Sequence, residues 1–144
     1  MPHASRTIVI DRPVSDVFAF FADAENDPRW RRGVLEIERN GPLGVGASYR
    51  QRVSGPGGRA IVADFEVTAY EPETRVAILT TAGPVRPTAV YEFRATEVGT
   101  EVVFTLDAQL SGVKKLVMSG MVQKTMDAEL AALDGAKRIL ESEA

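Results

Sequence analysis

Trp30, Tyr49 and Tyr91 each combine an apolar ring with a group that can donate a hydrogen bond. Such side chains can orient a ligand oxygen inside an apolar site, and a tyrosine can polarise a carbonyl or act as a weak acid. Because the unperturbed pKa of tyrosine is about 10, it is a poor base at neutral pH without a charged helper. Hydrogen bonding from these side chains to a ligand is therefore the chemistry that the sequence indicates most directly.

The absence of cysteine and the near absence of histidine exclude most other chemistry. The chain has no Cys, and its one His is His3, close to the N-terminus. This excludes disulfides, thiolate nucleophiles and Cys-ligated zinc or iron–sulfur centres. It also removes nearly all His-based metal sites and Ser-His-Asp catalysis. We therefore expect no metal and no cofactor, and we assign no catalytic residue.

The charge balance argues against a nucleic-acid partner. The 144 residues include 17 Lys and Arg against 20 Asp and Glu, a net charge of −3, so no strong basic field is present. Three arginines, Arg29, Arg31 and Arg32, flank Trp30. On an acidic chain this triplet is interpreted as a solvated helix end with Trp30 turned inward.

Glycine and lysine patterns point to turns and surface. The segment 55–58 is glycine-rich but lacks the Lys-Ser/Thr of a phosphate-binding loop, and the glycines of 41–46 lack the parallel βαβ context of a dinucleotide site. Lys114 and Lys115 open the last helix and are interpreted as surface residues, with the entrance of a site for an acidic ligand as the alternative. Neither glycine segment is assigned a ligand.

The N-terminal third reads as a strand followed by two short helices. Residues 5–11 form a β-branched run, which predicts a strand. From Pro13 to about Ala22, apolar residues recur at helical spacing, and Pro13 suits a first turn. Residues 24–32, which carry Trp30, predict a second short helix or turn.

After Gly33 the apolar period shortens to about two, which predicts a series of strands. Short turns rich in Gly and Pro separate them, so we expect an antiparallel meander. The expected strands are Val34–Arg39, Ala47–Ser54, Arg59–Tyr70, Val76–Thr81, Pro87–Thr96 and Thr100–Leu110.

Alternation along these strands predicts one apolar and one polar face. The apolar face is expected to hold Ile61, Ala63, Phe65, Val67, Ala69, Tyr91, Phe93, Ala95, Val102, Phe104 and Leu106. The charged groups that could assist a tyrosine fall on the solvent face, namely Asp64, Glu66, Glu92 and Arg94. The pattern leaves open whether Tyr49, Arg50 and Arg52 point inward or outward.

Residues 112–142 contain no proline and carry a drifting apolar stripe, which predicts a long C-terminal helix. Thirty helical residues would extend about 45 Å. A helix of that length suits an element lying across the apolar face of a curved sheet.

This order of elements, with several short motifs, resembles the Bet v 1-like helix-grip fold. Within that fold it is similar to the polyketide cyclase/dehydrase and START-related lipid-binding superfamily (SRPBCC). The resemblance covers nearly the whole chain. It is carried by Ile10-Asp11-Arg12-Pro13, Val17-Phe18-Ala19-Phe20-Phe21, Asp23 through Pro28 to Trp30, Gly41-Pro42-Leu43-Gly44-Val45-Gly46, Tyr70-Glu71-Pro72 before Arg75, and Gly99-Thr100.

The resemblance implies an α+β fold in which a curved antiparallel seven-stranded sheet carries two short helices after strand 1 and a long C-terminal helix over its concave face. It also implies a cavity between sheet and helix. Plain core packing is the alternative for each aromatic or Met residue there. The expected walls are Trp30, Tyr49, Phe65, Tyr91, Phe93, Phe104, Met118, Met121, Val122 and Met126.

From this reading, residues 1–144 are expected to form a single cytoplasmic ligand-binding domain. The leading hypothesis is binding or transport of a hydrophobic small molecule that is aromatic, polyketide-like or lipid-like. A cyclase- or dehydratase-like enzyme using Tyr49 or Tyr91 is the alternative, and an interaction module with a filled interior is a third. We expect no nucleic-acid partner and no integral membrane association, while exposed strand edges would permit a homodimer.

Overall fold

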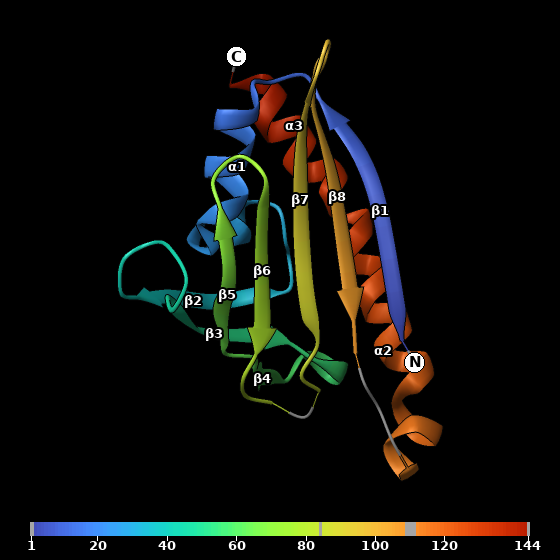
Figure 1. Ribbon diagram of the computed structural model, residues 1–144. Coiled ribbons are helices and arrows are strands. Elements are labelled where there is room, and N and C mark those ends of the chain that lie inside the picture. The colour runs from blue at the N-terminus through green and yellow to red at the C-terminus, as the bar shows by residue number, and fades with distance from the viewer. Residues whose placement is uncertain (1, 84, 109–111, 144) are drawn as a thin grey trace.

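The computed structural model describes residues 2–83, 85–108 and 112–143, and it shows a curled sheet with helices packed along one side (Figure 1). The strands are β1 (His3–Ile10), β2 (Val34–Asn40), β3 (Ser48–Ser54), β4 (Ala60–Val62), β5 (Phe65–Glu71), β6 (Arg75–Thr80), β7 (Thr88–Thr96) and β8 (Gly99–Asp107). The helical segments are α1 (Val14–Ala22), η1 (Ala24–Arg29), η2 (Pro56–Gly58), α2 (Gly112–Ala131) and α3 (Leu133–Ser142).

Seven strands form a continuous antiparallel path in the order β1-β8-β7-β6-β5-β3-β2. The short β4 lies off this path and pairs with β3. Figure 1 shows β2 and β3 running across the direction of β7 and β8, which is how the sheet curls. This arrangement confirms the predicted α+β fold with a curved seven-stranded antiparallel sheet and a long C-terminal helical segment.

The first helices form where the sequence predicts them. Helix α1 follows Pro13 and buries Val17, Phe18 and Phe21 against the sheet. Asp23 ends α1 and caps η1, because its Oδ1 accepts a hydrogen bond from the backbone N–H of Glu25 at 3.0 Å. The second short helix is a 3₁₀ helix over Ala24–Arg29, shorter than the expected 24–32. This cap sets the position of Asp27 and of the residues that follow it.

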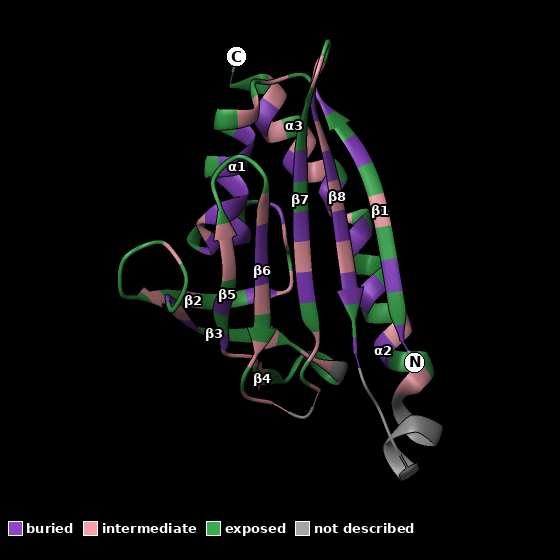
Figure 2. Cartoon of the chain, in the orientation of Figure 1, coloured by how far each residue is buried: buried purple, intermediate pink, exposed green. Residues whose placement is uncertain are grey.

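Buried and exposed residues alternate along β1, β7 and β8 (Figure 2). The cross-strand register places Tyr91 beside Phe104 and Phe93 beside Val102. These four side chains and Leu106 are all buried. The predicted apolar face of these strands is therefore the side that packs under the helices, except at Ala95, which is exposed near the end of β7.

The predicted strand Arg59–Tyr70 is broken into β4 and β5 by a kink at residues 63 and 64. At the kink the Asp64 carboxylate, rather than a main-chain carbonyl, accepts a hydrogen bond from the backbone N–H of Gln51 at 3.0 Å. The backbone N–H of Ala63 still donates to the Gln51 carbonyl at 2.8 Å. A side chain thus replaces one rung of the ladder, and the strand bends there.

A bulge in β5 corrects the predicted face of Ala69. The register with β6 shifts between Val67 and Ala69, so Val67 pairs with Ile78 while Tyr70 pairs with Val76. One extra residue in a strand reverses the alternation beyond it. Tyr70 therefore turns toward α1, and its ring lies 5.4 Å from that of Phe18 in an edge-to-face contact. Ala69 takes the opposite face.

The C-terminal helical segment is interrupted at Ala132, so α2 and α3 replace the single predicted helix. α2 and α3 both contact β1, and α3 lies at the end of the molecule where α1 packs. The side chains of Lys114, Lys115 and Met118, like residues 109 and 110 at the end of the last predicted strand, lie outside the described part of the chain. Within the described residues, no helix is both long and apolar enough to cross a membrane.

Candidate functional site

A cavity of about 390 Å³ lies between the sheet and α2. Strands β3 to β8 supply most of its wall, α2 supplies Met121, Val122, Thr125, Met126 and Glu129, and the region of η1 supplies Asp27 and Arg31. The exposed surface inside it is mainly apolar. Met121 is 44% exposed, which places it where the cavity meets solvent.

Seven of the ten predicted wall residues line this cavity. They are Tyr49, Phe65, Tyr91, Phe104, Met121, Val122 and Met126. Trp30 and Phe93 do not line it, because they are packed in the solid part of the core. There the Phe21 ring lies 5.6 Å from that of Trp30 and 6.1 Å from that of Phe93. Met118 lies outside the described side chains.

Two stacked aromatic pairs form separate parts of the wall. Tyr91 and Phe104 stack with centroids 4.3 Å apart, and Tyr49 stacks on Phe65 at 4.8 Å. The register thus turns Tyr49 inward. The Tyr49 hydroxyl accepts a hydrogen bond from the backbone N–H of Ala24 at 3.4 Å and is held by η1. Of the two tyrosines predicted to contact a ligand, Tyr91 is the one whose hydroxyl is not held by η1.

The charged side chains of the wall belong to a cluster built around Arg31, which we call the Arg31 cluster (Asp27, Arg31, Gln51 and Glu129). The hydroxyl residues Ser54, Thr80 and Thr125 also line the cavity. The guanidinium donates to both carboxylate oxygens of Glu129, through Nε at 2.6 Å and Nη2 at 3.2 Å. Its Nη1 donates to Asp27 Oδ2 at 2.8 Å and to Gln51 Oε1 at 3.2 Å. Gln51 in turn donates from Nε2 to the Ala63 carbonyl at 3.0 Å. Residues from η1, β3 and α2 therefore meet at one guanidinium.

Burial controls the ionisation of this cluster. It raises the pKa of Asp27 from 3.8 to about 6, although the neighbouring Arg31 opposes the shift. Burial disfavours the charge of Arg31 as well, but Glu129 and Asp27 outweigh it and raise the pKa of the guanidinium. The pKa of Tyr91 is raised well above 10, mainly by burial, with Asp27 adding to the effect. At neutral pH Tyr91 is therefore a hydrogen-bond donor.

The Arg31 cluster overturns the prediction that Arg31 belongs to a solvated helix end. Its side chain is 15% exposed, and its partner Glu129 lies 98 residues further along the chain. Sequence reasoning missed Asp27, Gln51 and Glu129 altogether. The signal that could have found the first of them is the spacing of Asp27 and Arg31, four residues apart.

The charged residues expected on the solvent face are exposed or tied to the main chain. Glu66, Glu92 and Arg94 are exposed, and Arg94 pairs with Glu101 at 3.0 Å. Asp64 serves the kink between β4 and β5. Arg50 and Arg52, whose direction the sequence left open, both point outward and pair with Glu38 and Glu36 of β2. Among the described residues, no group of three or more His, Cys, Asp or Glu could hold a metal ion.

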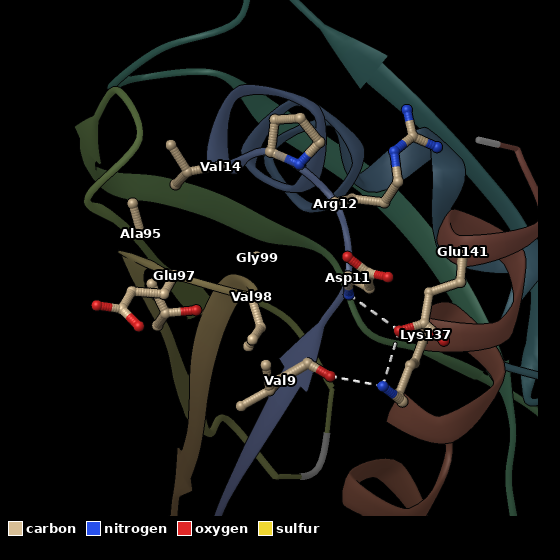
Figure 3. Close-up of a pocket in the computed structure, with 12 residues that line it drawn as sticks. Val9, Asp11, Arg12, Val14, Ala95, Glu97, Val98, Gly99, Lys137 and Glu141 are labelled. Atoms are coloured by element: carbon tan, nitrogen blue, oxygen red, sulfur yellow. Dashed lines mark hydrogen bonds and ion pairs between the residues drawn. The ribbon is translucent and has the colours of Figure 1, made fainter.

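A second hollow of about 840 Å³ lies at the surface where β1, the β7–β8 turn and α3 meet (Figure 3). The charged side chains that α3 contributes are already paired there. Lys137 Nζ donates to the Val9 carbonyl at 2.6 Å and to Glu141 at 2.8 Å, while Glu141 also accepts from the backbone N–H of Asp11 at 2.9 Å. This hollow is open to solvent, so the interior cavity is the better candidate site.

Comparison with known proteins gives one family and one fold. Residues 1–136 match the family model described as polyketide cyclase / dehydrase and lipid transport. No curated protein matches the chain.

Several solved structures share the architecture. The structure of TTHA0849 from Thermus thermophilus has a TM-score of 0.81 at 21% identity, covering 99% of each chain. The di-domain ARO/CYC StfQ from the steffimycin biosynthetic pathway has a TM-score of 0.81 at 14% identity, covering 99% of this chain and 51% of that one. Ara h 8.0201 has a TM-score of 0.74 at 12% identity, covering 97% of each chain. At these identities the likeness concerns the fold.

Proposed function

The chain belongs to the polyketide cyclase / dehydrase and lipid transport family, and from this premise we propose that it binds a hydrophobic small molecule in the interior cavity. The ligand is aromatic, polyketide-like or lipid-like. The observation that carries the proposal is a largely apolar hollow whose charged lining residues, among those that the structure describes, form one compact cluster.

The size and lining of the cavity support a small organic ligand. Its volume of about 390 Å³ falls within the range of roughly 300–1,000 Å³ typical of ligand pockets. Burying apolar ligand surface contributes about 25 cal/mol per Å². The flat stacked faces of Tyr91 and Phe104 suit a planar ring system. Such a hollow argues against an interaction module with a filled interior.

The Arg31 cluster gives the ligand an orientation. A polar group buried without a hydrogen-bond partner costs about 1–3 kcal/mol, so a polar atom of the ligand is placed at the cluster rather than against the apolar wall. The mechanism of binding is therefore burial of the apolar body with the polar end at Arg31, Asp27 and Tyr91.

A neutral fluorescent probe, N-phenyl-1-naphthylamine, tests the proposal. Its emission rises when it leaves water for an apolar site, so titration with the protein is expected to give a saturable signal with one site per chain. Ala89 lies on β7 and lines the cavity. Ala89→Phe is expected to fill part of the hollow and weaken probe binding about tenfold or more, because overpacking leaves no room for the ligand.

The control is the next residue on the same strand. Val90 faces the opposite side of the sheet and does not line the cavity, so Val90→Phe is expected to leave probe binding unchanged. Equal weakening in both variants, or no saturable binding to the wild-type protein, would count against the proposal.

An enzyme is the second candidate, favoured because Asp27, whose pKa burial raises to about 6, and Tyr91, which stays protonated at neutral pH, line the same cavity. Such a carboxyl exchanges protons near neutral pH. In this reaction Asp27 takes a proton from the carbon next to one carbonyl. The resulting enolate carbon bonds to a second carbonyl carbon, and the proton held by Asp27 passes to the oxygen of that carbonyl to give a hydroxyl group. Asp27 then removes a second proton from the same α-carbon, so that a carbon–carbon double bond forms and the hydroxyl leaves with that proton as water. Tyr91 donates a hydrogen bond to the carbonyl oxygen.

Heptane-2,6-dione tests this second candidate, because its ring closure with loss of one water gives 3-methylcyclohex-2-enone, which absorbs in the ultraviolet. Tyr91→Phe is expected to slow the reaction about a hundredfold while retaining binding of N-phenyl-1-naphthylamine. A protein that binds the probe but does not accelerate ring closure is a binding protein only.

A further inference from the structure

We propose that the Arg31 cluster makes the cavity selective for ligands whose polar end donates hydrogen bonds, a hydroxyl or an ammonium group, and that it excludes carboxylates. The inference rests on the proposed binding function and names the class of ligand.

The charge of the cluster is unfavourable to an anion. One guanidinium stands between two carboxylates, Asp27 and Glu129, so the ionised cluster carries a net charge of −1. The Asp27 side chain is 6% exposed and that of Glu129 is 25% exposed. With so little water nearby, a ligand carboxylate would feel both negative groups at reduced screening.

Arg31 has little left with which to bind an anion. A guanidinium offers five N–H groups, and the partners of Arg31 are two oxygens of Glu129, one of Asp27 and one of Gln51. Bidentate capture of a carboxylate needs two parallel N–H groups. Because Glu129 already occupies the Nε and Nη2 edge, that geometry is taken by the protein itself.

In contrast to the donors of Arg31, one hydrogen-bond acceptor of the cluster has no partner. Asp27 Oδ1 is buried and has no hydrogen-bond partner among the described residues, although Asp27 lines the cavity. An unpaired buried carboxylate oxygen is costly, and a donor from a ligand would remove that cost. A hydroxyl or an ammonium group supplies such a donor, whereas a carboxylate supplies only more acceptors.

Tyr91 lines the same cavity, and its ionisation responds to the charges of the Arg31 cluster. Burial is the main reason that the pKa of its hydroxyl is raised; Asp27 and Glu129 raise it further, while Arg31 lowers it. A negative charge at the Tyr91 hydroxyl is therefore disfavoured, as a ligand carboxylate beside it would be.

Three naphthalenes that differ only in the polar end test the proposal at pH 7.5. They are 2-naphthalenemethanol, 2-(aminomethyl)naphthalene and 2-naphthoic acid, used to displace bound N-phenyl-1-naphthylamine from the protein. The alcohol and the amine are expected to compete, and the acid is expected to be weaker by about tenfold or more. An acid that competes as well as the alcohol overturns the selectivity but leaves the binding function standing. Failure of the probe itself to bind overturns the binding function.

Charge-neutralising variants locate the effect. Asp27→Asn is expected to bring the affinity for 2-naphthoic acid to within about threefold of that for the alcohol, because the net charge of the cluster falls to zero. Glu129→Gln, at a less buried position, is expected to act in the same direction if Asp27→Asn does not fold. Asp127→Asn makes the same change of charge at an exposed position of α2 and is expected to preserve the selectivity. Unchanged selectivity in both Asp27→Asn and Glu129→Gln would overturn the proposal.

Discussion

Arg31 joins segments that are far apart in the sequence. Its removal would leave buried carboxylates without a counter-ion and so lower the free energy of unfolding. Its guanidinium compensates Asp27 and Glu129 at 2.8 and 2.6 Å. A buried ion pair is a modest source of stability when complete, but breaking one leaves an uncompensated charge in a poor solvent. The cluster is therefore a point where one substitution has a large effect.

Arg31→Met is expected to lower the free energy of unfolding by about 3–5 kcal/mol, because it leaves two carboxylates without their cation. The measurement is urea denaturation at pH 7.5, followed by circular dichroism. Arg50→Met is the control, since Arg50 pairs with Glu38 at 3.3 Å in an exposed position and exposed pairs contribute about 0–1 kcal/mol. Similar losses in the two variants would contradict the buried position of Arg31.

The raised pKa of Asp27 predicts that the stability of the protein depends on pH with a sign that is unusual for a carboxylate. Because its pKa is about 6 in the folded protein against 3.8 ordinarily, the folded state keeps a proton that the unfolded state has released between these values. The stability contributed by Asp27 is thus full below about pH 4 and lost as the pH rises through about 6. Relative to the wild type, Asp27→Asn is expected to gain stability between pH 4 and 7, on the order of a few kcal/mol.

Asp134 provides a control of opposite sign. Arg6 donates a hydrogen bond to its carboxylate and lowers its pKa. The stability contributed by Asp134 is therefore present above its ordinary pKa and lost as the pH falls. In urea denaturation from pH 3 to 7, Asp27→Asn is expected to gain stability relative to the wild type as the pH rises from about 4 to 6, whereas Asp134→Asn is expected to lose stability relative to the wild type as the pH rises from 3 through about 4. Parallel slopes would show that Asp27 is not buried as described.

The residues of the site were partly predictable from the sequence. Aromatic rings such as Tyr91 and Phe104 follow from strand alternation, because one parity of each strand is apolar. The Arg31 cluster does not follow, because a charged side chain is solvated on average and the partner that buries it lies in α2. Pairing across 98 residues leaves no local pattern.

At the scale of elements, the turn between β7 and β8 fixes the end of the sheet against β1. Gly99 has φ +147°, and a Cβ placed there would lie 2.1 Å from the carbonyl oxygen of Ile10. Only glycine fits both the backbone conformation and the close approach. The β7–β8 hairpin therefore packs closely against the end of β1.

Gly99→Ala is expected to destabilise the protein by about 1–3 kcal/mol or more, through strained backbone and contact with Ile10. Gly120→Ala is the matched control, because a Cβ at that helical position would meet no atom within 4 Å beyond the backbone of its own helical turns. There the exchange is expected to stabilise by about 0.5–1 kcal/mol, since alanine favours a helix. Thermal denaturation of the two variants measures both effects, and a loss at Gly120 equal to that at Gly99 would refute the argument.

The elements themselves were predicted closely, and their irregularities were not. Alternating apolar residues predict the strands, and turn residues predict where they end. The kink at Asp64 and the bulge beyond Val67 depend on which side-chain or main-chain atom completes the ladder. Which atom pairs there depends on the residues of the neighbouring strand, and these lie elsewhere in the sequence. One consequence is that Tyr70, rather than Ala69, packs against Phe18.

At the scale of the whole molecule, the interior has a filled end and a hollow end. The rings of Phe18, Phe21, Trp30 and Phe93 interlock in edge-to-face and tilted contacts near α1, and Phe21 stands at the boundary because it also lines the cavity. The cavity lies beneath α2, where Met and Val side chains cover the curled sheet. This division explains why Trp30 and Phe93, predicted as cavity walls, belong to the solid core: α1 supplies rings that fill that end.

A ligand that occupies the hollow end is expected to raise the thermal stability of the protein. N-phenyl-1-naphthylamine at one hundred times its dissociation constant contributes about 2.7 kcal/mol, which shifts Tm by roughly 5–15 °C for a chain of this size. Phe93→Ala is expected to lose about 3–5 kcal/mol yet retain that shift, because Phe93 packs in the filled end. Ala89→Phe is expected to lose the shift. The shift is measured by differential scanning calorimetry, because emission from the probe would interfere with a fluorescence readout. Loss of the shift in Phe93→Ala would show that the two ends of the interior are not independent.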